Sequence, residues 1–237
     1  MNIKDIISQY PYKTELHAHS NPVSKCGRFP ADEVVGIYLP TGINTLTITN
    51  HLTEKHLADK TTDEVVEFYL SDYSKAKKAA EGTDMTVALG VEIRFVNTNN
   101  DYLVYGVCEN DIEKMVHYVN TDIQTFYKEF KNDKNVILQA HPFRDKMEPI
   151  PFGYVDGIET LNLHPGHNSR IALAARIARE HDFIVSGGSD FHEEGRHATC
   201  LLRTRDKLRD SYDIADAIRS RDVLFEVSGN VVFPYSY

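Results

Sequence analysis

The chain has 237 residues, of which 41% are apolar and 26% are charged, an ordinary composition for a globular protein. Its formal net charge of −9 opposes binding to a phosphate backbone, which argues against nucleic acid as the main partner. The apolar runs are too short to span a membrane, and the first residues lack the cleavage pattern of a signal peptide. We therefore expect a cytoplasmic protein with no membrane partner. The three cysteines are odd in number and form no CxxC pair, which fits a reducing compartment.

Strands alternate with helices along the chain. Several predicted strands are continuous apolar runs, as expected for strands that are buried on both faces. We predict strands at residues 13–19, 45–51, 86–95, 102–107, 136–141, 157–162, 183–190, 199–203 and 223–228. Apolar residues at three- and four-residue spacing, together with helix start and stop signals, predict helices at residues 30–42, 63–82, 168–181 and 213–221.

This alternation predicts the fold class, which is α/β. No repeat, low-complexity stretch or linker divides the sequence, so we expect a single domain over residues 1–237. Repeated β-then-α units predict a parallel sheet, and their number predicts that the sheet closes into a TIM-like barrel. Catalytic groups in such a fold lie at the C-terminal ends of the strands.

Five predicted strands end in side chains of the kind that bind metals. His17 and His19 are two residues apart on the first strand, so they point to the same face. The complete set of candidate metal ligands is His17, His19, His51, Glu92, His141, Asp190 and His192. Each of them alone is more often an ordinary hydrogen-bonded residue, but seven on one rim predict a metal centre.

Seven ligands exceed the roughly four that one zinc ion takes, so we expect two or three divalent ions. Mixed imidazole and carboxylate donors fit zinc, manganese or iron better than magnesium or calcium. Such a centre turns bound water into a hydroxide that attacks phosphorus, without a phosphoenzyme. We assign this catalysis to His17, His19, Glu92, Asp190 and His192. The sequence contains no GxSxG, P-loop or dinucleotide fingerprint that would offer a rival chemistry.

The segments "ELHAHS", "TITNH", "GVEIRF", "LQAHPFR" and "SGGSDFH" resemble, in this order, the motifs of the PHP (polymerase and histidinol phosphatase) family. The resemblance implies a distorted (β/α)7 barrel with a trinuclear metal site. It implies that the protein hydrolyses phosphate esters or serves as an accessory domain of a DNA polymerase. By this likeness, His17, His19, Glu92 and Asp190 would hold one metal, Glu92 and His141 a second, and His51 and His192 the third.

The chain departs from the family pattern at three places. Asn50 precedes His51 where the family has aspartate, the loop at residues 20–30 lacks the usual ligand motif, and Cys108 stands where some members have histidine. Two metals therefore remain an alternative to three. We interpret Cys26 and Cys108 as packing residues.

Further residues near these motifs are candidates for substrate binding. Arg94 and Arg144 follow metal-ligand motifs, and Arg170 is the last residue of the segment "HNSR". Arginine offers a bidentate fork for phosphate. Each of them fits a solvated surface residue equally well. His167 is either a metal contact or a residue at a helix N-terminus. Asn168 is either a substrate contact or a helix cap, and His197 is a candidate proton donor. The loops at 20–30, 142–156 and 193–198 would recognise the substrate.

Three functions are compatible with these observations. The first is a phosphomonoesterase of the histidinol-phosphatase kind, acting on a small phosphorylated substrate. The second is an amidohydrolase-type metal-dependent hydrolase, which usually needs a carboxylated lysine between its metals. The third is a non-catalytic domain that binds metal or a partner. The near-complete ligand set favours the first. Neither the substrate, the identity of the metal nor the oligomeric state follows from the sequence.

Overall fold

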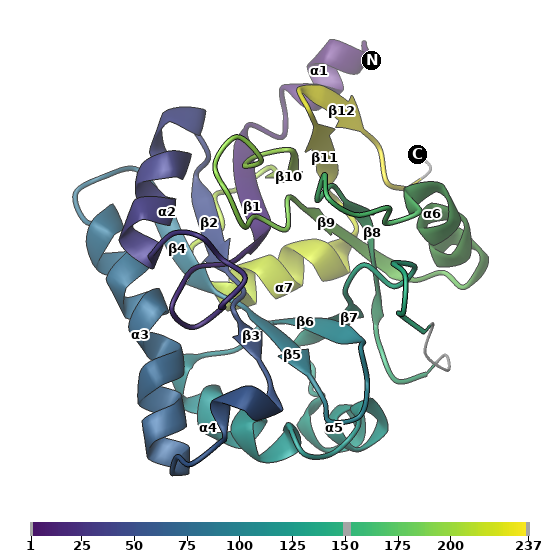
Figure 1. Cartoon of the computed structure of the whole chain (residues 1–237). Helices are drawn as coiled ribbons and strands as arrows, with labels where there is room; N and C mark the ends of the chain where they lie inside the picture. The colour runs from purple at the N-terminus through teal and green to yellow at the C-terminus, as the bar shows by residue number, and fades with distance from the viewer. Residues whose placement is uncertain (1, 149–152, 236–237) are drawn as a thin grey trace.

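The computed structural model describes residues 2–148 and 153–235, and it has a mixed α/β architecture (Figure 1). Its strands are β1 (Tyr12–Ala18), β2 (Thr45–Ile48), β3 (His51–Leu52), β4 (Thr86–Leu89), β5 (Val91–Arg94), β6 (Asp101–Tyr105), β7 (Val136–Gln139), β8 (Gly157–Asn162), β9 (Ile184–Gly188), β10 (Cys200–Thr204), β11 (Leu224–Val227) and β12 (Asn230–Val232). Its helices are α1 (Ile3–Ile7), α2 (Ala31–Tyr38), α3 (Thr62–Ala80), α4 (Glu109–Tyr118), α5 (Ile123–Phe130), α6 (Ile171–Glu180) and α7 (Ser211–Ser220), with 3-10 turns η1 (Leu39–Thr41) and η2 (Glu54–His56).

The strands pair into two six-stranded sheets. One has the order β12-β11-β10-β1-β2-β4, and the other has the order β3-β5-β6-β7-β8-β9. The prediction of a parallel sheet is wrong in part, because β1 runs antiparallel to β10 and β6 runs antiparallel to both β5 and β7. The connection from β5 to β6 is too short for the crossover that parallel neighbours need, so these two strands form a hairpin.

The two sheets meet at two places. The chain continues from β2 into β3 and from β4 into β5, the latter across Gly90, where a Cβ would lie 2.7 Å from Thr49 Cγ2. On the other side, Phe191 bridges to Ala18 at the end of β1, and its N–H donates to the carbonyl of His17 at 3.1 Å. The strand pairing of the described residues does not show one closed barrel, so barrel closure stays a prediction.

Helices cover the sheets on several sides. In Figure 1, α2 and α3 lie beside β4 and β2, α4 and α5 lie below β5 and β6, and α6 packs against β8 at the opposite side. The sequence prediction contained no helix between residues 108 and 135, where the structure has α4 and α5. Their buried residues do follow a helical spacing: Ile112, Met115 and Val116 in α4, and Ile123, Phe126 and Phe130 in α5. None of the helices in the described ranges is long and apolar enough to cross a membrane.

The alternation of side chains along β1 positions the site. Leu16 and Ala18 pack in the apolar core, so Glu15, His17 and His19 point to the other face of the strand. The predicted recognition loop at 142–156 contains residues 149–152, which lie outside the described residues.

Candidate metal centre

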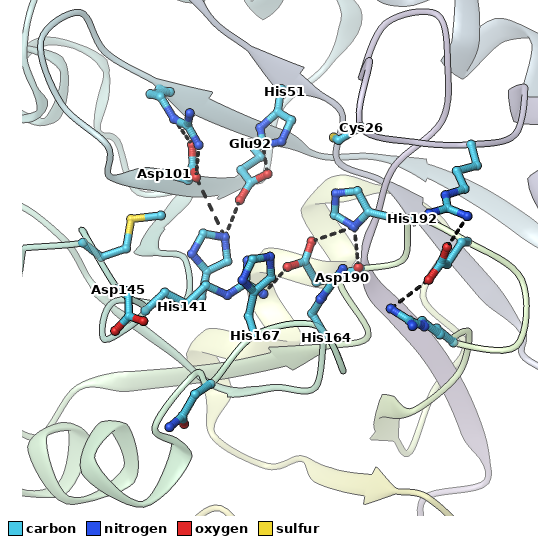
Figure 2. Close-up of a pocket in the computed structure, with 17 residues that line it drawn as sticks. Cys26, His51, Glu92, Asp101, His141, Asp145, His164, His167, Asp190 and His192 are labelled. Carbon is cyan, nitrogen blue, oxygen red and sulfur yellow. Dashed lines mark hydrogen bonds and ion pairs between the residues drawn. The ribbon is translucent and has the colours of Figure 1, made fainter.

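Five of the seven predicted ligands line one cavity, namely His51, Glu92, His141, Asp190 and His192 (Figure 2). His17 and His19 do not line it, but their ring nitrogens lie close to these residues in shared groups of possible metal ligands. His17 and His19 come from the end of β1, His51 from β3, Glu92 from β5, and the other three residues directly follow β7 or β9. His17, His19 and Glu92 are fully buried, and Asp190 and His141 are nearly so. Residues from both sheets thus meet where the sheets come together.

The side chains are close enough to share bound ions. The Nε2 atoms of His17 and His19 are 3.1 Å apart, and they lie 3.4 and 3.3 Å from Asp190 Oδ1. Glu92 reaches in two directions, with Oε1 3.0 Å from His141 Nε2 and Oε2 2.9 Å from His51 Nδ1. This arrangement is typical of metal ligands, because two imidazole nitrogens face each other beside one carboxylate oxygen.

Several of these buried atoms have no hydrogen-bond partner. They are Glu92 Oε2, His51 Nδ1 and His141 Nδ1. Glu92 Oε2 and His51 Nδ1 are close to each other, but not at an angle that makes a hydrogen bond. Leaving buried polar atoms without a hydrogen-bond partner costs free energy, whereas a cation between Glu92 Oε2 and His51 Nδ1 would interact favourably with both atoms. The residues present therefore fit divalent metal ions.

The backbone of the site is held in an uncommon conformation. His141 and Asp190 have φ values of 29° and 50°, although neither is glycine. Such conformations cost free energy and persist where the surrounding structure requires them, often at functional sites.

The ionisation of the cluster is strongly shifted. Burial opposes charge on His17 and Glu92. Even so, the carboxylates of Glu159, Asp190 and Glu92 raise the pKa of His17 well above its usual range. Likewise, despite burial, His51 and His17 hold the pKa of Glu92 well below the usual range of a glutamate. In the absence of metal, protons on the imidazoles therefore balance the carboxylates, and cations would take over that role.

Four overlapping groups of side chains could each hold a metal ion, with all ligand atoms of a group within 4.8 Å of one another. The groups are His17, His19 and Asp190; His17, Glu92 and His141; His51, Glu92 and Asp101; and His19, Cys26, His51 and His192. Glu92 belongs to two groups, which places it where a bridging carboxylate would be.

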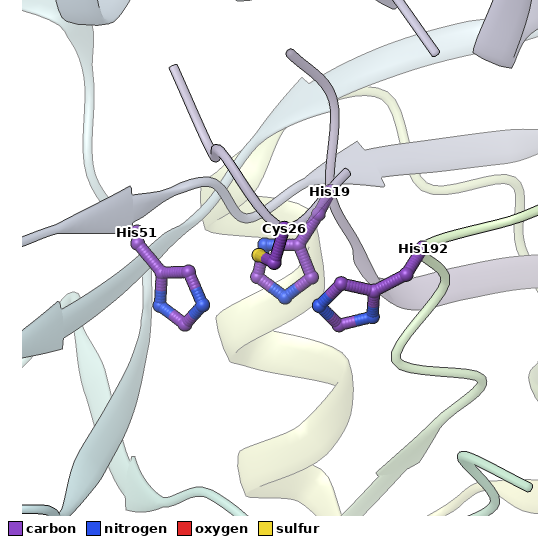
Figure 3. A group of neighbouring side chains, drawn as sticks. All are labelled: His19, Cys26, His51 and His192. Atoms are coloured by element: carbon purple, nitrogen blue, oxygen red, sulfur yellow. The ribbon is translucent and has the colours of Figure 1, made fainter. Parts of the chain in front are cut away.

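Cys26 is not a packing residue, contrary to the prediction. Its side chain is exposed, and its sulfur lies beside the ring of His19 with His51 and His192 on either side (Figure 3). Burial opposes ionisation of the thiol, yet hydrogen bonds from His192 and His51 and the charge of His19 lower the pKa of Cys26 to about 5. The loop that contains it turns back over the metal-ligand face, a path that the sequence does not reveal. Cys108 is half-buried at the N-cap of α4, where its Sγ donates to Asp111, so it belongs to the start of this helix and to none of the groups of possible metal ligands among the described residues.

Asp101 is not among the ligands predicted from the sequence, and the reason lies in the direction of its strand. It opens β6, and a ligand at the start of a strand lies far from the others in a parallel sheet. Because β6 is antiparallel to β5, its first residue is paired with Arg94 and lies at the same rim. Asp101 accepts two hydrogen bonds from Arg94, at 2.7 and 2.6 Å, and lies 3.9 Å from His141 Nε2.

Glu159 supports the ligands from behind. It accepts a hydrogen bond from His17 Nδ1 at 2.8 Å and from the backbone N–H of His141 at 3.0 Å. With its Nδ1 proton donated in this way, His17 presents Nε2 to the centre. His192 is oriented similarly, since its Nδ1 donates to the carbonyl of Asp190 at 2.7 Å. Glu159 was not among the predicted site residues, and the sequence signal that could have indicated it is a glutamate inside the apolar run of β8.

The cavity at this centre has a volume of about 480 Å³, and several arginines are among the residues that line it. Arg144 donates to Asp190 and Asn162, and Arg94 is held by Asp101. Arg28 and Arg196 also line the cavity, and both form ion pairs with Glu193. These arginines place several N–H donors around an opening of small-molecule size.

The other predicted substrate contacts differ in position. His167 and Asn168 line the cavity, together with His164, which the sequence analysis did not single out. Burial, more than any other factor, lowers the pKa of His164 to about 4. Asn168 accepts a hydrogen bond from the backbone N–H of Arg170, but it does not cap α6, because Arg170 is the N-cap residue and no side chain caps this helix.

Arg170 and His197 do not line this cavity. Arg170 begins α6, where it donates to Asp145 and to the carbonyl of Phe143. His197 packs against the rings of Tyr38 and Phe191. Their positions give no support to the substrate-binding roles predicted for them, because the segments that follow the ligand motifs lead these two side chains away from the opening.

Comparisons with known proteins bear on the fold. No family model and no curated protein sequence matches the chain. Among solved structures, a two-domain protein from Bacteroides vulgatus, described as containing a predicted PHP-like metal-dependent phosphoesterase, superposes with a TM-score of 0.66 at 19% identity over 92% of this chain. The chain spans 66% of the length of that protein.

Two further structures are similar. PsfC from Pseudomonas syringae has a TM-score of 0.61 at 13% identity, over 94% of this chain and 91% of its own. A candidate metal-dependent phosphoesterase from Bifidobacterium adolescentis has a TM-score of 0.51 at 16% identity, over 87% of this chain and 95% of its own. The chain therefore has a PHP-like fold, which confirms the resemblance seen in its motifs at the level of the fold.

Proposed function

We propose that this protein is a metal-dependent phosphoesterase that hydrolyses small phosphomonoesters. The observation that carries the proposal is the convergence of buried imidazoles and carboxylates, with unpaired ligand atoms, on a cavity rimmed by arginines. Water adds to phosphorus and the ester oxygen leaves as an alcohol, so that the products are phosphate and the alcohol. This assignment takes a small phosphorylated molecule as the partner and leaves no role for nucleic acid or membrane.

Two or three divalent ions of zinc, manganese or iron fit the four ligand groups. When bound, such ions acidify water and stabilise charge on a phosphoryl group. His17, His19 and Asp190 would hold one ion, and Glu92 and His141 would share in a second. Glu159 keeps the ligand nitrogen of His17 turned toward the centre.

The arginines account for the preference for a monoester. A monoester presents a dianionic terminal phosphate, and Arg144, Arg28 and Arg196 offer N–H donors on the rim where that phosphate would enter. A phosphodiester within a nucleic acid brings a polyanion toward a protein of net charge −9. Among the described residues, no lysine lines this cavity, which disfavours the amidohydrolase alternative with its carboxylated lysine.

The test measures metal content and phosphate release together. The protein is stripped with a chelator and reloaded separately with zinc, manganese or iron. It is then assayed with p-nitrophenyl phosphate, its bis-ester, histidinol phosphate, sugar phosphates and a short oligonucleotide. We expect hydrolysis only after reloading, with the monoesters turned over faster than the bis-ester or the oligonucleotide.

Asp190→Asn should lower both the metal content and, by about a hundredfold or more, kcat/KM. Asp182→Asn is the control, because Asp182 is exposed and pairs with Arg221 away from the cavity. Phosphate release that persists after metal removal, or an Asp190→Asn variant with full activity and metal content, would contradict the proposal.

A further inference from the structure

A second, larger cavity opens beside the metal centre. It has a volume of about 820 Å³ and shares Cys26, His51 and Arg94 with the first. Its other walls come from the loop after β1, from η2 and the residues that follow it, from α3, and from the loop after β5. A molecule whose phosphate lies at the metal centre therefore has room to extend into this second space.

The charge of this cavity is opposite to that of the whole protein. Its cationic residues are Lys25, Lys55, Lys60 and Arg94, against one carboxylate, Glu54. Arg94 is neutralised by Asp101, but the three lysines form no ion pair with any residue in the described ranges. Three exposed ammonium groups around one hollow of an acidic protein, none of them in an ion pair among the described residues, point to an anionic ligand.

The wall that carries the lysines is held in place. His56 Nδ1 accepts a hydrogen bond from the N–H of Thr53 at 3.2 Å, so its Nε2 carries the proton and donates to the carbonyl of Val23 at 2.9 Å. This ring therefore ties η2 to the loop after β1. The groove between these two segments is part of the folded structure and is not a gap between loose loops.

The floor of the cavity is partly apolar. Phe68 and Phe95 line it, and Lys60 Nζ lies 4.9 Å from the centre of the Phe68 ring. Asn97, Thr98 and Asn99 add polar side chains to the lining. An occupant would thus have an apolar body and a charged group near the lysines.

We infer that this lysine groove, formed by Lys25, Lys55 and Lys60 over Phe68, binds the alcohol portion of the substrate, and that this portion carries a second anionic group. The ligand class is a phosphate ester with a carboxylate, sulfate or second phosphate at a distance from the scissile phosphate. The inference rests on the proposed function, since it takes the scissile phosphate to lie at the metal centre.

The test compares phenyl phosphate with 3-carboxyphenyl phosphate, which differ by one anionic group. In the variant Lys25→Gln/Lys55→Gln/Lys60→Gln, we expect kcat/KM for the carboxylated ester to fall about tenfold, while that for phenyl phosphate changes by less than about twofold. The control variant Lys4→Gln/Lys78→Gln/Lys134→Gln removes the same charge from exposed lysines outside both cavities and should leave both esters unaffected. Equal changes for the two esters in the first variant would overturn the inference.

Calorimetry separates this inference from the proposed function. Phenylphosphonate and 3-carboxyphenylphosphonate cannot be hydrolysed, and their binding to the zinc-loaded protein does not require turnover. A higher affinity for the carboxylated compound, lost in the lysine variant, supports the groove even if neither ester is hydrolysed. Equal affinity for the two phosphonates overturns the groove, whether or not the esters are substrates.

Discussion

Cys26 gives one group of imidazoles a sulfur donor. The group of His19, His51 and His192 contains no carboxylate, whereas each of the three neighbouring groups contains at least one. Thiolate and imidazole suit zinc and other softer ions, and carboxylates suit harder ones such as manganese. The ligand group that contains Cys26 therefore suits a softer metal ion than the three groups that contain carboxylates.

The first residue-scale prediction concerns this sulfur. With cobalt as the probe ion, the wild-type protein should show a near-ultraviolet sulfur-to-cobalt charge-transfer absorption, because a thiolate would be bound directly to the metal. Cys26→Ser should lose this absorption and bind about one metal ion fewer. Cys108→Ser, at the start of α4, is the matched control and should keep it. An absorption that survives in Cys26→Ser would rule out the sulfur as a ligand.

A second residue-scale prediction distinguishes two arginines. Arg144 touches Asp190 and lines the metal-centre cavity, whereas Arg170 is half exposed and pairs with Asp145 outside it. Arg144→Gln should raise KM or lower kcat/KM by an amount equivalent to roughly 1.5–3 kcal/mol, the contribution of a charge-assisted hydrogen bond, with metal retained. Arg170→Gln should leave the kinetics unchanged. Equal effects of the two substitutions would remove Arg144 from the substrate site.

At the scale of elements, close approach of β9 to β1 positions the first pair of histidines. Gly188, the last residue of β9, lies so near β1 that a Cβ would be 2.5 Å from the Cβ of His17 and 3.0 Å from its backbone nitrogen. Only glycine fits there without moving one of the strands. The spacing between His17 and Asp190 therefore depends on this residue.

Gly188→Ala should lower the free energy of unfolding by roughly 1–3 kcal/mol through overpacking and should weaken metal binding. Gly36→Ala provides the contrast, because Gly36 is exposed in α2 and a Cβ there meets nothing within 4 Å. This change should stabilise the protein by about 0.5–1 kcal/mol. Urea unfolding and metal titration of both variants test the argument, and a Gly188→Ala variant with wild-type stability and metal affinity would contradict it.

At the scale of the whole molecule, the buried charges make stability depend on pH. The carboxylates around His17 and His51 raise the pKa values of these rings despite burial. The contribution of the two protonated rings to the free energy of unfolding is therefore fully present below about pH 6.5, and it is lost as pH rises through their folded-state pKa values. The pKa values of Glu92 and Asp190 are lowered by the histidines around them, and for Asp190 also by Arg144, although burial opposes this. The contribution of these two carboxylates to the free energy of unfolding is present above about pH 4 and is lost as pH falls through their folded-state pKa values.

The metal-free protein should therefore be most stable between about pH 4 and 6.5 and should lose stability as pH rises above this range and protons leave the imidazoles of His17 and His51. Metal ions replace these protons, so the rise in Tm on adding metal should be larger at about pH 8 than at about pH 6. Glu92→Gln should reduce this pH dependence, because it removes the carboxylate shared between two ligand groups. The measurement is thermal unfolding with and without metal at both pH values. A metal-induced rise in Tm that is equal at the two values would contradict the coupling.

Local patterns in the sequence were enough to single out the seven candidate ligands that the structure brings close together. His17 and His19 share a face because side chains alternate along a strand, and Asp190 and His192 follow an apolar run that could only be a buried strand. These relations involve neighbours in the chain, so they can be derived without the fold.

The tertiary structure decided the rest. Asp101 joins the site because β6 runs antiparallel to β5, and Cys26 joins it because the loop after β1 folds back over the rim. Arg170 follows a ligand-bearing segment in sequence, but the start of α6 turns it away from the cavity. Strand direction and loop path depend on contacts between distant parts of the chain, and no local pattern of residues encodes them. For that reason the sequence alone determined which kinds of ligand are present, and only the fold decided which other side chains complete the site.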